Sequence, residues 1–395
     1  MKLPAYVRQL MQKLAENGYE CYVVGGAVRS TMLNLPVHDY DLTTNALPEQ
    51  MKEVFSSFRT LETGIKHGTL TVLADHHPLE ITTYRKDSAY ADHRHPDHVE
   101  FTSALKEDCA RRDFTVNALC SDAEGNILDF FHGKEDLEKK IIRCIGRADD
   151  RFDEDALRIL RALRFAARLS FSIDPATSQA LHAKKDLLHF ISAERIQEET
   201  EGFLEAQNCA SLLEEYRDVV EVFIPELKNC KETIWNSMLS SIRRSPDDSE
   251  IRMAVLLGNE EKPESILKRM KYSNASMKRI SCMIQCGKMQ LNNDADLKRI
   301  MNSLNCPFAQ FAGYRSAVDP SVSYEEMMEM HQSIMDRKEC WNLKDLAIDG
   351  NDLKEAGLKG KQIHNALQSA LDEVIEKRLP NSRYELLNYI NSQKW

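Results

Sequence analysis

Residues 21–44, with the sequence CYVVGGAVRSTMLNLPVHDYDLTT, decide the fold of the first part of this chain. The apolar run that ends at Val24 predicts a short buried strand, closed by the two glycines that follow it. Residues 27–33 then change to a helical pattern, and residues 38–44 return to the alternating polarity of a strand. A glycine pair between a buried strand and a helix lets the backbone approach a bound molecule closely.

Further strands are predicted at 68–74 and 78–85, on either side of a short polar turn. Residues 1–20 predict an amphipathic helix that ends at Gly18, and from about residue 150 helical periodicity replaces the alternating runs. The predicted fold is therefore an α/β head with a mixed, mostly antiparallel sheet, followed by an all-helical remainder.

The composition is typical of a globular protein, with 42% hydrophobic and 29% charged residues in a chain of 395. No apolar run reaches the roughly 18 residues that a membrane-spanning helix needs. The first residues also lack the apolar core of a signal peptide, so we expect a cytoplasmic protein with no membrane contact. The net charge of −10 excludes a surface coated with basic residues, and any nucleic-acid binding would therefore use a local basic track.

The ten cysteines form no CxxC pair. Cys282 and Cys286 lie four residues apart in an apolar, helical context, and such thiols are expected to be buried small hydrophobic groups rather than metal ligands. Without a secretory signal, reduced thiols are the expectation for the whole chain.

Asp39 and Asp41 are the first candidate site residues. On a strand, two carboxylates two residues apart project from the same face, and such oxygen donors suit Mg²⁺ and in-line displacement at a triphosphate. Two other interpretations stay open at this point. The stretch could be an exposed polar strand, or His38 and Asp39 could belong to a His-Asp hydrolase site, although His76 and His77 lie in a polar turn without helical spacing.

Thirteen residues before Asp39, Gly26 precedes a predicted helix whose free amides could receive a phosphate, and Arg29 lies one turn into that helix. The later segment 107–119, EDCARRDFTVNAL, places Arg111 and Arg112 before an aspartate that is predicted to cap a short helix. This segment would add a guanidinium group near a bound nucleotide.

Residues 154–164, EDALRILRALR, predict a helix on which acidic and basic residues follow a three-residue step along one face: Asp155, Arg158, Arg161 and Arg164. A carboxylate beside a guanidinium offers an acceptor next to donors, which fits the amino group and ring acceptors of cytosine and adenine. Uracil and guanine would leave buried groups unpaired. The alternative is a surface ion pair between Glu154 or Asp155 and Arg158.

Four of these stretches stand in the order and spacing of the class II tRNA nucleotidyltransferases: GGAVR, DYDLTT, RRDFTVNA and EDALRILRALRFAARL. The sequence resembles the CCA-adding enzymes of the Bacillus type, in the superfamily that they share with bacterial poly(A) polymerases. The resemblance continues more loosely to the C-terminus through IDGNDLKEAGLKGKQI. It implies a polymerase-β-like nucleotidyltransferase head at 1–148, a neck with the base-reading helix at 149–210, a helical body at 211–300 and a tRNA-binding helical tail at 301–395.

The resemblance also implies an activity and its participants. The family adds or repairs the 3′-terminal CCA of tRNA from CTP and ATP, without a nucleic-acid template, and it grips the acceptor stem and elbow of the tRNA. Asp39 and Asp41 would bind Mg²⁺ and support attack of the tRNA 3′-hydroxyl on the α-phosphate. The implied nucleotide-binding residues are Gly26, Arg29, Arg112, Asp155, Arg158, Arg161 and Arg164.

Glu80 is a candidate third carboxylate. Two positions depart from the family pattern, namely Ser30 after GGAVR and His95 in the loop KDSAYADHRHPDHVEF, although the presence of that loop favours addition of the full CCA. Alternatives within the superfamily are a poly(A) polymerase and an enzyme that adds only A or only CC, and another is a non-catalytic RNA-binding relative. A homodimer is an assembly that the sequence leaves open. A basic track that could line RNA, or could be an ordinary solvated face, is formed by Lys139, Lys140, Arg143, Arg147 and Arg151.

Overall fold

The computed structural model describes residues 1–87 and 99–395 of the chain. These residues form two compact units, residues 1–229 and residues 230–395, and each is described by itself. The predicted division into four parts stays a prediction. Most of the loop in which His95 lies falls outside the described residues.

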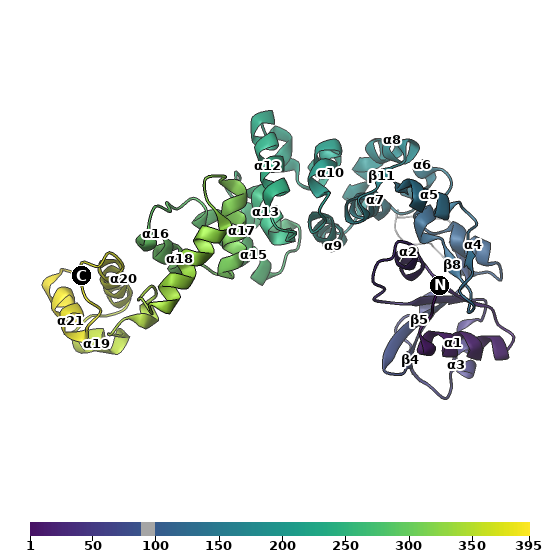
Figure 1. The fold of residues 1–395 in the computed structure, drawn as a ribbon, viewed down its shortest axis with the longest axis horizontal. Coiled ribbons are helices and arrows are strands. Elements are labelled where there is room, and N and C mark those ends of the chain that lie inside the picture. Colours follow the sequence, from purple (N-terminus) through teal and green to yellow (C-terminus); the bar gives the residue numbers. More distant parts are fainter. Residues whose placement is uncertain (88–98) are drawn as a thin grey trace. The chain divides into compact units, whose positions relative to one another are not determined.

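The first unit is built on one sheet with the strand order β3-β4-β5-β2-β1-β8-β9 (Figure 1). Its strands are β1 (Cys21–Val24), β2 (Asp41–Thr44), β3 (Arg59–Leu61), β4 (Thr69–Ala74), β5 (His77–Thr83), β8 (Cys120–Ser121) and β9 (Ile127–Leu128). Only the β2–β5 pair is parallel, and the other neighbours are antiparallel. The predicted mixed, mostly antiparallel sheet is confirmed.

Helix α1 (Ala5–Glu16) packs on β1 and β4 through a stripe of buried residues at helical spacing, Val7, Leu10, Met11 and Leu14. Helix α3 (Pro48–Val54) lies beside it and also contacts β4. Helix α2 (Gly26–Met32) contacts β1. The strand–glycine–helix–strand unit is therefore confirmed, with its helix starting directly after the glycine pair.

The hairpin between β4 and β5 turns at Asp75 and His76, whose φ angles are +49° and +65°. Positive φ at both central residues is the geometry of a type I′ turn, which matches the twist of the two strands. His77 begins β5, and its ring stacks on Tyr6 with 4.3 Å between centroids. Both histidines are therefore used by the hairpin and its packing, which leaves the hydrolase interpretation without support from these positions.

The sheet is followed by mostly helical chain. The remaining elements of the first unit are β6 (Arg85–Asp87), β7 (Val99–Phe101), α4 (Leu105–Ala110), η2 (Thr115–Asn117), α5 (Gly133–Lys139), β10 (Ile141–Ile142), α6 (Ala148–Glu154), α7 (Leu157–Leu169), β11 (Ser172–Ile173), α8 (Pro175–Lys184), α9 (Ala193–Leu204), α10 (Cys209–Glu215) and α11 (Arg217–Phe223), with the 3₁₀ turns η1 (Ile65–His67), η3 (Lys185–Phe190) and η4 (Pro225–Asn229). The predicted change to helical structure near residue 150 is confirmed.

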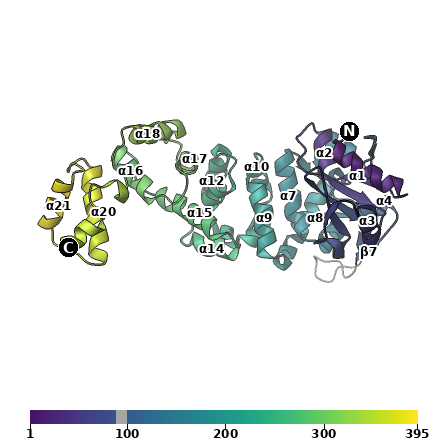
Figure 2. The same cartoon turned by 90° about the horizontal axis from the view of Figure 1, so that it is seen from below.

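The second unit contains only helices and short turns (Figure 2). They are α12 (Glu232–Arg244), α13 (Ser249–Leu257), α14 (Pro263–Arg269), α15 (Asn274–Cys286), α16 (Asp294–Ser303), α17 (Phe308–Val318), α18 (Tyr324–Asp336), η5 (Leu343–Asp345), α19 (Gly350–Glu355), α20 (Lys361–Ile375) and α21 (Arg383–Ser392). One apolar core lies among α15–α18, and a separate one lies among α19–α21. No described helix is long and apolar enough to cross a membrane.

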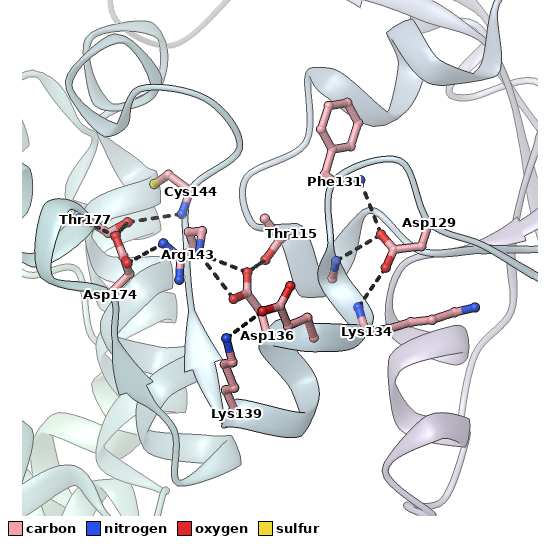
Figure 3. A network of polar contacts seen from close by, with 12 residues as sticks. Thr115, Asp129, Phe131, Lys134, Asp136, Lys139, Arg143, Cys144, Asp174 and Thr177 are labelled. Atoms are coloured by element: carbon pink, nitrogen blue, oxygen red, sulfur yellow. Dashed lines mark hydrogen bonds and ion pairs between the residues drawn. The ribbon is translucent and has the colours of Figure 1, made fainter.

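A polar network joins the end of the head to α8 (Figure 3). The buried carboxylate of Asp136 accepts hydrogen bonds from the Thr115 hydroxyl at 2.6 Å and from Arg143 Nε at 3.1 Å. Arg143 also donates to Asp174, which caps α8 by accepting from the backbone of Thr177. The network therefore ties the 3₁₀ turn η2 to α5 and to the start of α8.

Four members of the predicted basic track have acidic partners within the chain. Arg143 pairs with Asp136 and Asp174, and the other three pairs are Lys139 with Glu135, Arg147 with Asp150 and Arg151 with Glu154. The structure thus gives these cations an internal role, and RNA contact by the track stays a prediction.

Replacing the buried carboxylate of this network should cost more stability than replacing its exposed neighbour. We expect Asp136→Ala to lower the free energy of unfolding by about 2–3 kcal/mol, because the Thr115 hydroxyl and the Arg143 guanidinium lose a charged acceptor. Glu135→Ala removes an exposed pair with Lys139 and should cost less than about 1 kcal/mol. Urea unfolding followed by circular dichroism measures both changes, and equal losses would contradict the role given to Asp136.

Candidate active site

A cavity of about 350 Å³ in the first unit collects most of the candidate residues. It is lined by Gly25, Gly26, Arg29, Asp41, Arg111, Arg112, Asp113, Asn117, Asp155, Arg158, Arg161 and Phe165. A second cavity of about 420 Å³ shares Gly26, Arg29 and Asp41 with the first and adds Ser30, His38 and Asp39. Of the predicted site residues, only Arg164 lines neither cavity.

The glycine pair shapes the floor of the first cavity. Gly25 has φ of +67°, and a Cβ atom there would stand 3.2 Å from Nη1 of Arg112. Its amide donates to the carbonyl of Leu119, which holds the turn against the chain before β8. Glycine at this position therefore permits both the backbone conformation and the close approach of an arginine.

Arg29 is held in this cavity without a full set of partners. Its Nη1 donates to the side-chain oxygen of Asn117, and its guanidinium lies 4.9 Å from the ring centroid of Phe165. Its Nε is buried and has no hydrogen-bond partner among the described residues. Burial lowers the pKa of Arg29 to about 10, and Arg168, Arg161 and Arg164 lower it further while Asp113 opposes them. An anion placed here would relieve this electrostatic cost.

The carboxylate pair differs from the prediction in one respect. β2 begins at Asp41, so Asp39 lies in the loop before the strand, and the argument from a shared strand face was wrong. The reason is that pairing with β1 starts at Val24, opposite Asp41, and does not extend to Asp39. Instead, Glu80 of β5 lies directly beside Asp41 in the parallel register.

The carboxyl group of Asp41 has a raised pKa. Burial is the main cause, and the negative charges of Glu80 and Asp39 add to it, whereas Arg112 acts in the opposite direction. The three carboxylates therefore influence one another electrostatically, although no group of three His, Cys, Asp or Glu side chains in the described parts of the chain is gathered tightly enough to hold a metal ion. Their hard oxygen donors are nonetheless the kind that Mg²⁺ prefers.

The predicted base-reading helix is interrupted. α6 ends at Glu154, Asp155 has extended backbone angles, and α7 starts at Leu157. Asp155 is outside the helix because its side chain accepts a hydrogen bond from the backbone of Leu157 at 3.1 Å, a local alternative to helical bonding. The uniform three-residue step on one helix was therefore wrong at its first residue.

Arg158 is only 6% exposed and donates to the Glu154 carboxylate at 2.8 Å and to the carbonyls of Arg151 and Arg111. The ion pair with Glu154, which was the alternative to the base-reading interpretation, is thus present. Asp155 and Arg158 nevertheless both line the cavity.

The two later arginines of α7 diverge. Arg161 donates to the Asp113 carboxylate at 2.9 Å and lines the cavity, whereas Arg164 pairs with Glu199 of α9 at 2.7 Å. The guanidinium groups of both lie about as close to the Phe165 ring as that of Arg29, at 5.2 and 5.0 Å from its centroid. Arg164 therefore belongs to the wall behind the cavity.

Sequence reasoning missed the central role of Asp113. It was predicted to cap a short helix, but the following turn η2 is preceded by Phe114 and has no side-chain cap. Asp113 instead accepts hydrogen bonds from the Phe114 amide, Asn117 and Arg161. Burial alone would raise the pKa of Asp113, but Arg161 and these hydrogen bonds hold it below its usual value. Asn117 and Phe165 were also missed, since no charge pattern marks them in the sequence.

Comparison with known proteins now identifies the family. The chain is 34% identical to the CCA-adding enzyme of Lactobacillus johnsonii, over 97% of this chain and 96% of that protein. The chain belongs to the CCA-adding enzyme family. It is also 35% identical to the CCA-adding enzyme of Streptococcus pyogenes, over 94% of this chain and 92% of the relative.

The family assignment extends over most of the chain. Residues 21–143 match the family model of the poly A polymerase head domain, and residues 251–390 match tRNA nucleotidyltransferase domain 2. The crystal structure of the CCA-adding enzyme of Bacillus stearothermophilus in complex with CTP is similar, with a TM-score of 0.81 and 28% identity over 99% of this chain and 97% of that one. The CCA-adding enzyme of Thermotoga maritima complexed with tRNA shares the fold, with a TM-score of 0.71 and 19% identity over 99% of this chain and 97% of that one. Nucleotidyltransferases of this family generally use a divalent metal.

The raised pKa of Asp41 predicts how the metal-free protein responds to loss of this charge. A carboxyl group with a raised pKa in the folded state stabilises the fold below its unfolded pKa, and this contribution is lost as pH rises through the folded pKa. We therefore expect Asp41→Asn to raise the Tm of the metal-free protein at pH 7 and to leave it unchanged well below the usual pKa of aspartate. Thermal unfolding at both pH values measures this, with Asp75→Asn on the exposed hairpin turn as the control.

A lower Tm for metal-free Asp41→Asn at pH 7 would contradict carboxylate repulsion at this position. Addition of Mg²⁺ should then raise the Tm of the unmodified chain and not that of Asp41→Asn, because only the former keeps the full set of anionic oxygens.

Proposed function

We propose that this chain adds or repairs the 3′-terminal CCA of tRNA, using CTP and ATP and no nucleic-acid template. The observation that carries the proposal is the single cavity lined at once by the glycine turn, Asp41, the arginines and Asp155. Relatives over nearly the whole chain are CCA-adding enzymes, and a similar structure is a complex with CTP, which supports the same substrates here.

The proposed site divides the nucleotide among separate groups. The backbone at Gly26 and the guanidinium groups of Arg29 and Arg112 lie where they could bind the triphosphate and sugar. Asp39 and Asp41, with Glu80 beside Asp41, are the residues that would hold Mg²⁺, which when bound would neutralise phosphate charge and assist the attacking hydroxyl. These are hard oxygen donors, and their mutual repulsion in the free protein is what a bound cation would offset.

In the proposed reaction, the tRNA 3′-hydroxyl oxygen forms a bond to the α-phosphorus while the bond between the α-phosphorus and its bridging oxygen to the β-phosphate breaks. The hydroxyl proton is lost, and diphosphate leaves with the electron pair of the broken bond. The arginines of the cavity would stabilise the charge that accumulates on the phosphate oxygens. The protein contributes position and electrostatics rather than a covalent intermediate.

Asp155 and Arg158 are proposed to read the base. Asp155 accepts only, so it would bind the amino group of cytosine or adenine and would repel the carbonyl of uracil or guanine. The break between α6 and α7 frees this carboxylate from a helix face and sets it on the rim of the cavity. The extended backbone at Asp155 thus fits the proposed role better than the continuous helix that the sequence suggested.

We further propose that the acceptor stem and elbow of tRNA contact the helical parts of the chain, with the tail at 301–395 on the elbow. A cytoplasmic location is proposed from the family and from the ten cysteines, all of which are free thiols.

Incubation with tRNA that lacks its 3′ end tests the activity directly. We expect incorporation of C from CTP alone, addition of A only after two C residues, and no extension beyond the final A. Long A tails would instead indicate a poly(A) polymerase, and C only or A only would indicate a partial enzyme. Asp39→Ala and Asp41→Ala should each abolish incorporation while the chain stays folded and binds tRNA. Binding of tRNA by the unmodified chain without any incorporation would indicate a non-catalytic relative.

Substitutions at the base-reading pair should change selectivity rather than rate alone. Asp155→Asn keeps the size of the side chain but adds a donor, so we expect UTP to be accepted and the preference for CTP over UTP to fall by about tenfold or more. Arg158→Ala should also relax base choice. Single-nucleotide incorporation with each triphosphate measures this, and Arg164→Ala, on the wall behind the cavity, is the control. A uniformly slower enzyme with unchanged preference would contradict the base-reading role.

A further inference from the structure

A second cavity-bearing site lies in the other unit, far along the sequence from the nucleotide cavity. Between α14 and α15 the chain encloses about 470 Å³, a volume within the range that holds small ligands. Lys268, Lys278 and Glu264 are among its lining residues, together with Ser281, Cys282 and Asn305. The two lysines against one glutamate give the cavity a positive balance.

Cys282 stands in a cluster of three thiols. Its sulfur lies 3.8 Å from that of Cys286, one turn later on α15, and it also has a side-chain hydrogen bond with Cys306, which lies before α17. The backbone amide of Asn305 donates to the Cys282 sulfur at 3.1 Å. These hydrogen bonds hold the pKa of the Cys282 thiol below its usual range, while burial and the same contacts raise the pKa of Cys286 and of Cys306.

An independent observation points to a ligand in this cavity. Ser281 is 6% exposed and lines the cavity beside Cys282, and its hydroxyl has no hydrogen-bond partner among the residues that the structure describes. A buried hydroxyl without a partner costs free energy unless a bound molecule supplies one. The cavity therefore offers a nucleophilic sulfur, an unsatisfied hydroxyl and cationic walls at one place.

From these features we propose that Cys282 is a thiol–disulfide exchange site for small, negatively charged disulfides. The Cys282 thiolate attacks one sulfur of the disulfide, the sulfur–sulfur bond breaks, and one thiolate leaves with its electron pair, so that Cys282 carries a mixed disulfide. A second protein thiol then attacks the Cys282 sulfur and releases the other small thiolate. In total, two protein thiols are oxidised to a disulfide, and one small disulfide is reduced to two thiols.

Cys306 is the better second thiol. Residues four apart on a helix have Cβ atoms about 5–6 Å apart, whereas a disulfide needs about 3.5–4.5 Å, so Cys286 could bond to Cys282 only by distorting α15. Cys306 lies between α16 and α17, where the backbone is not constrained by helical hydrogen bonds.

Peptide-level mass spectrometry of the folded full-length chain tests this site. With oxidised glutathione as the anionic probe, we expect Cys282 to be modified at least about tenfold faster than any other cysteine. The cationic disulfide cystamine should react more slowly at Cys282, and Lys268→Glu with Lys278→Glu should reverse this order. In Cys306→Ser the mixed disulfide should accumulate, whereas in the unmodified chain it should convert to a Cys282–Cys306 bond.

Cys109 and Cys120 provide a matched control within the same molecule. Their sulfurs are only 3.2 Å apart and both residues are fully buried, but neither lines any cavity described above. If thiol proximity were sufficient, this pair would react as fast as Cys282, and that result would overturn the proposal. Modification of Cys282 only after unfolding, or with no preference for the anionic probe, would also overturn it. Thermal unfolding of each variant verifies that it is folded.

Discussion

The candidate site is organised by the buried carboxylate of Asp113. This one group accepts hydrogen bonds from the amide of Phe114 and the side chain of Asn117 in its own loop, and from Arg161 on α7. Asn117 in turn accepts from Arg29 on α2. A single acceptor therefore connects the helix after the glycine turn, the arginine-containing loop and the helix proposed to read the base. Removing it would leave several buried donors unpaired, each of which is costly in a medium of low dielectric constant.

Charges of like sign are gathered on each side of this connection. Asp39, Asp41 and Glu80 raise the free energy of the ionised Asp41, and the arginines around Arg29 do the same for its protonated form. Evolution of a purely structural surface would separate such charges, whereas a site for a triphosphate and a divalent cation gathers them, because the ligand supplies the missing counter-charges. The free protein thus holds both groups in states that binding would relieve.

Much of the head could be predicted because its signals are local. The apolar run before Gly25, the helical pattern after it and the alternating residues of β4 and β5 each depend on residues close in sequence, so periodicity was sufficient. The errors arose where a short-range bond competed with the periodic pattern. Asp155 left its predicted helix because its carboxylate binds the nearby amide of Leu157, and Asp39 left its predicted strand because β1 is too short to pair with it. Asp113 had the right residue type for a cap, but its strongest partner lies 48 positions away.

The sequence by itself determined the order of the elements, the family and the residue types of the site. The spacing of the glycines, the two aspartates and the arginine series restricts the chemistry to nucleotides and metal, and these features are readable without coordinates. The tertiary structure decided which of these residues share a cavity: it placed Asp155 and Arg161 beside Asp41, moved Arg164 behind the wall, and brought Cys306 to Cys282 and Cys286. The physical reason is that hydrogen bonds and ion pairs between distant segments depend on how the chain packs, and periodicity in one segment carries no information about a partner in another.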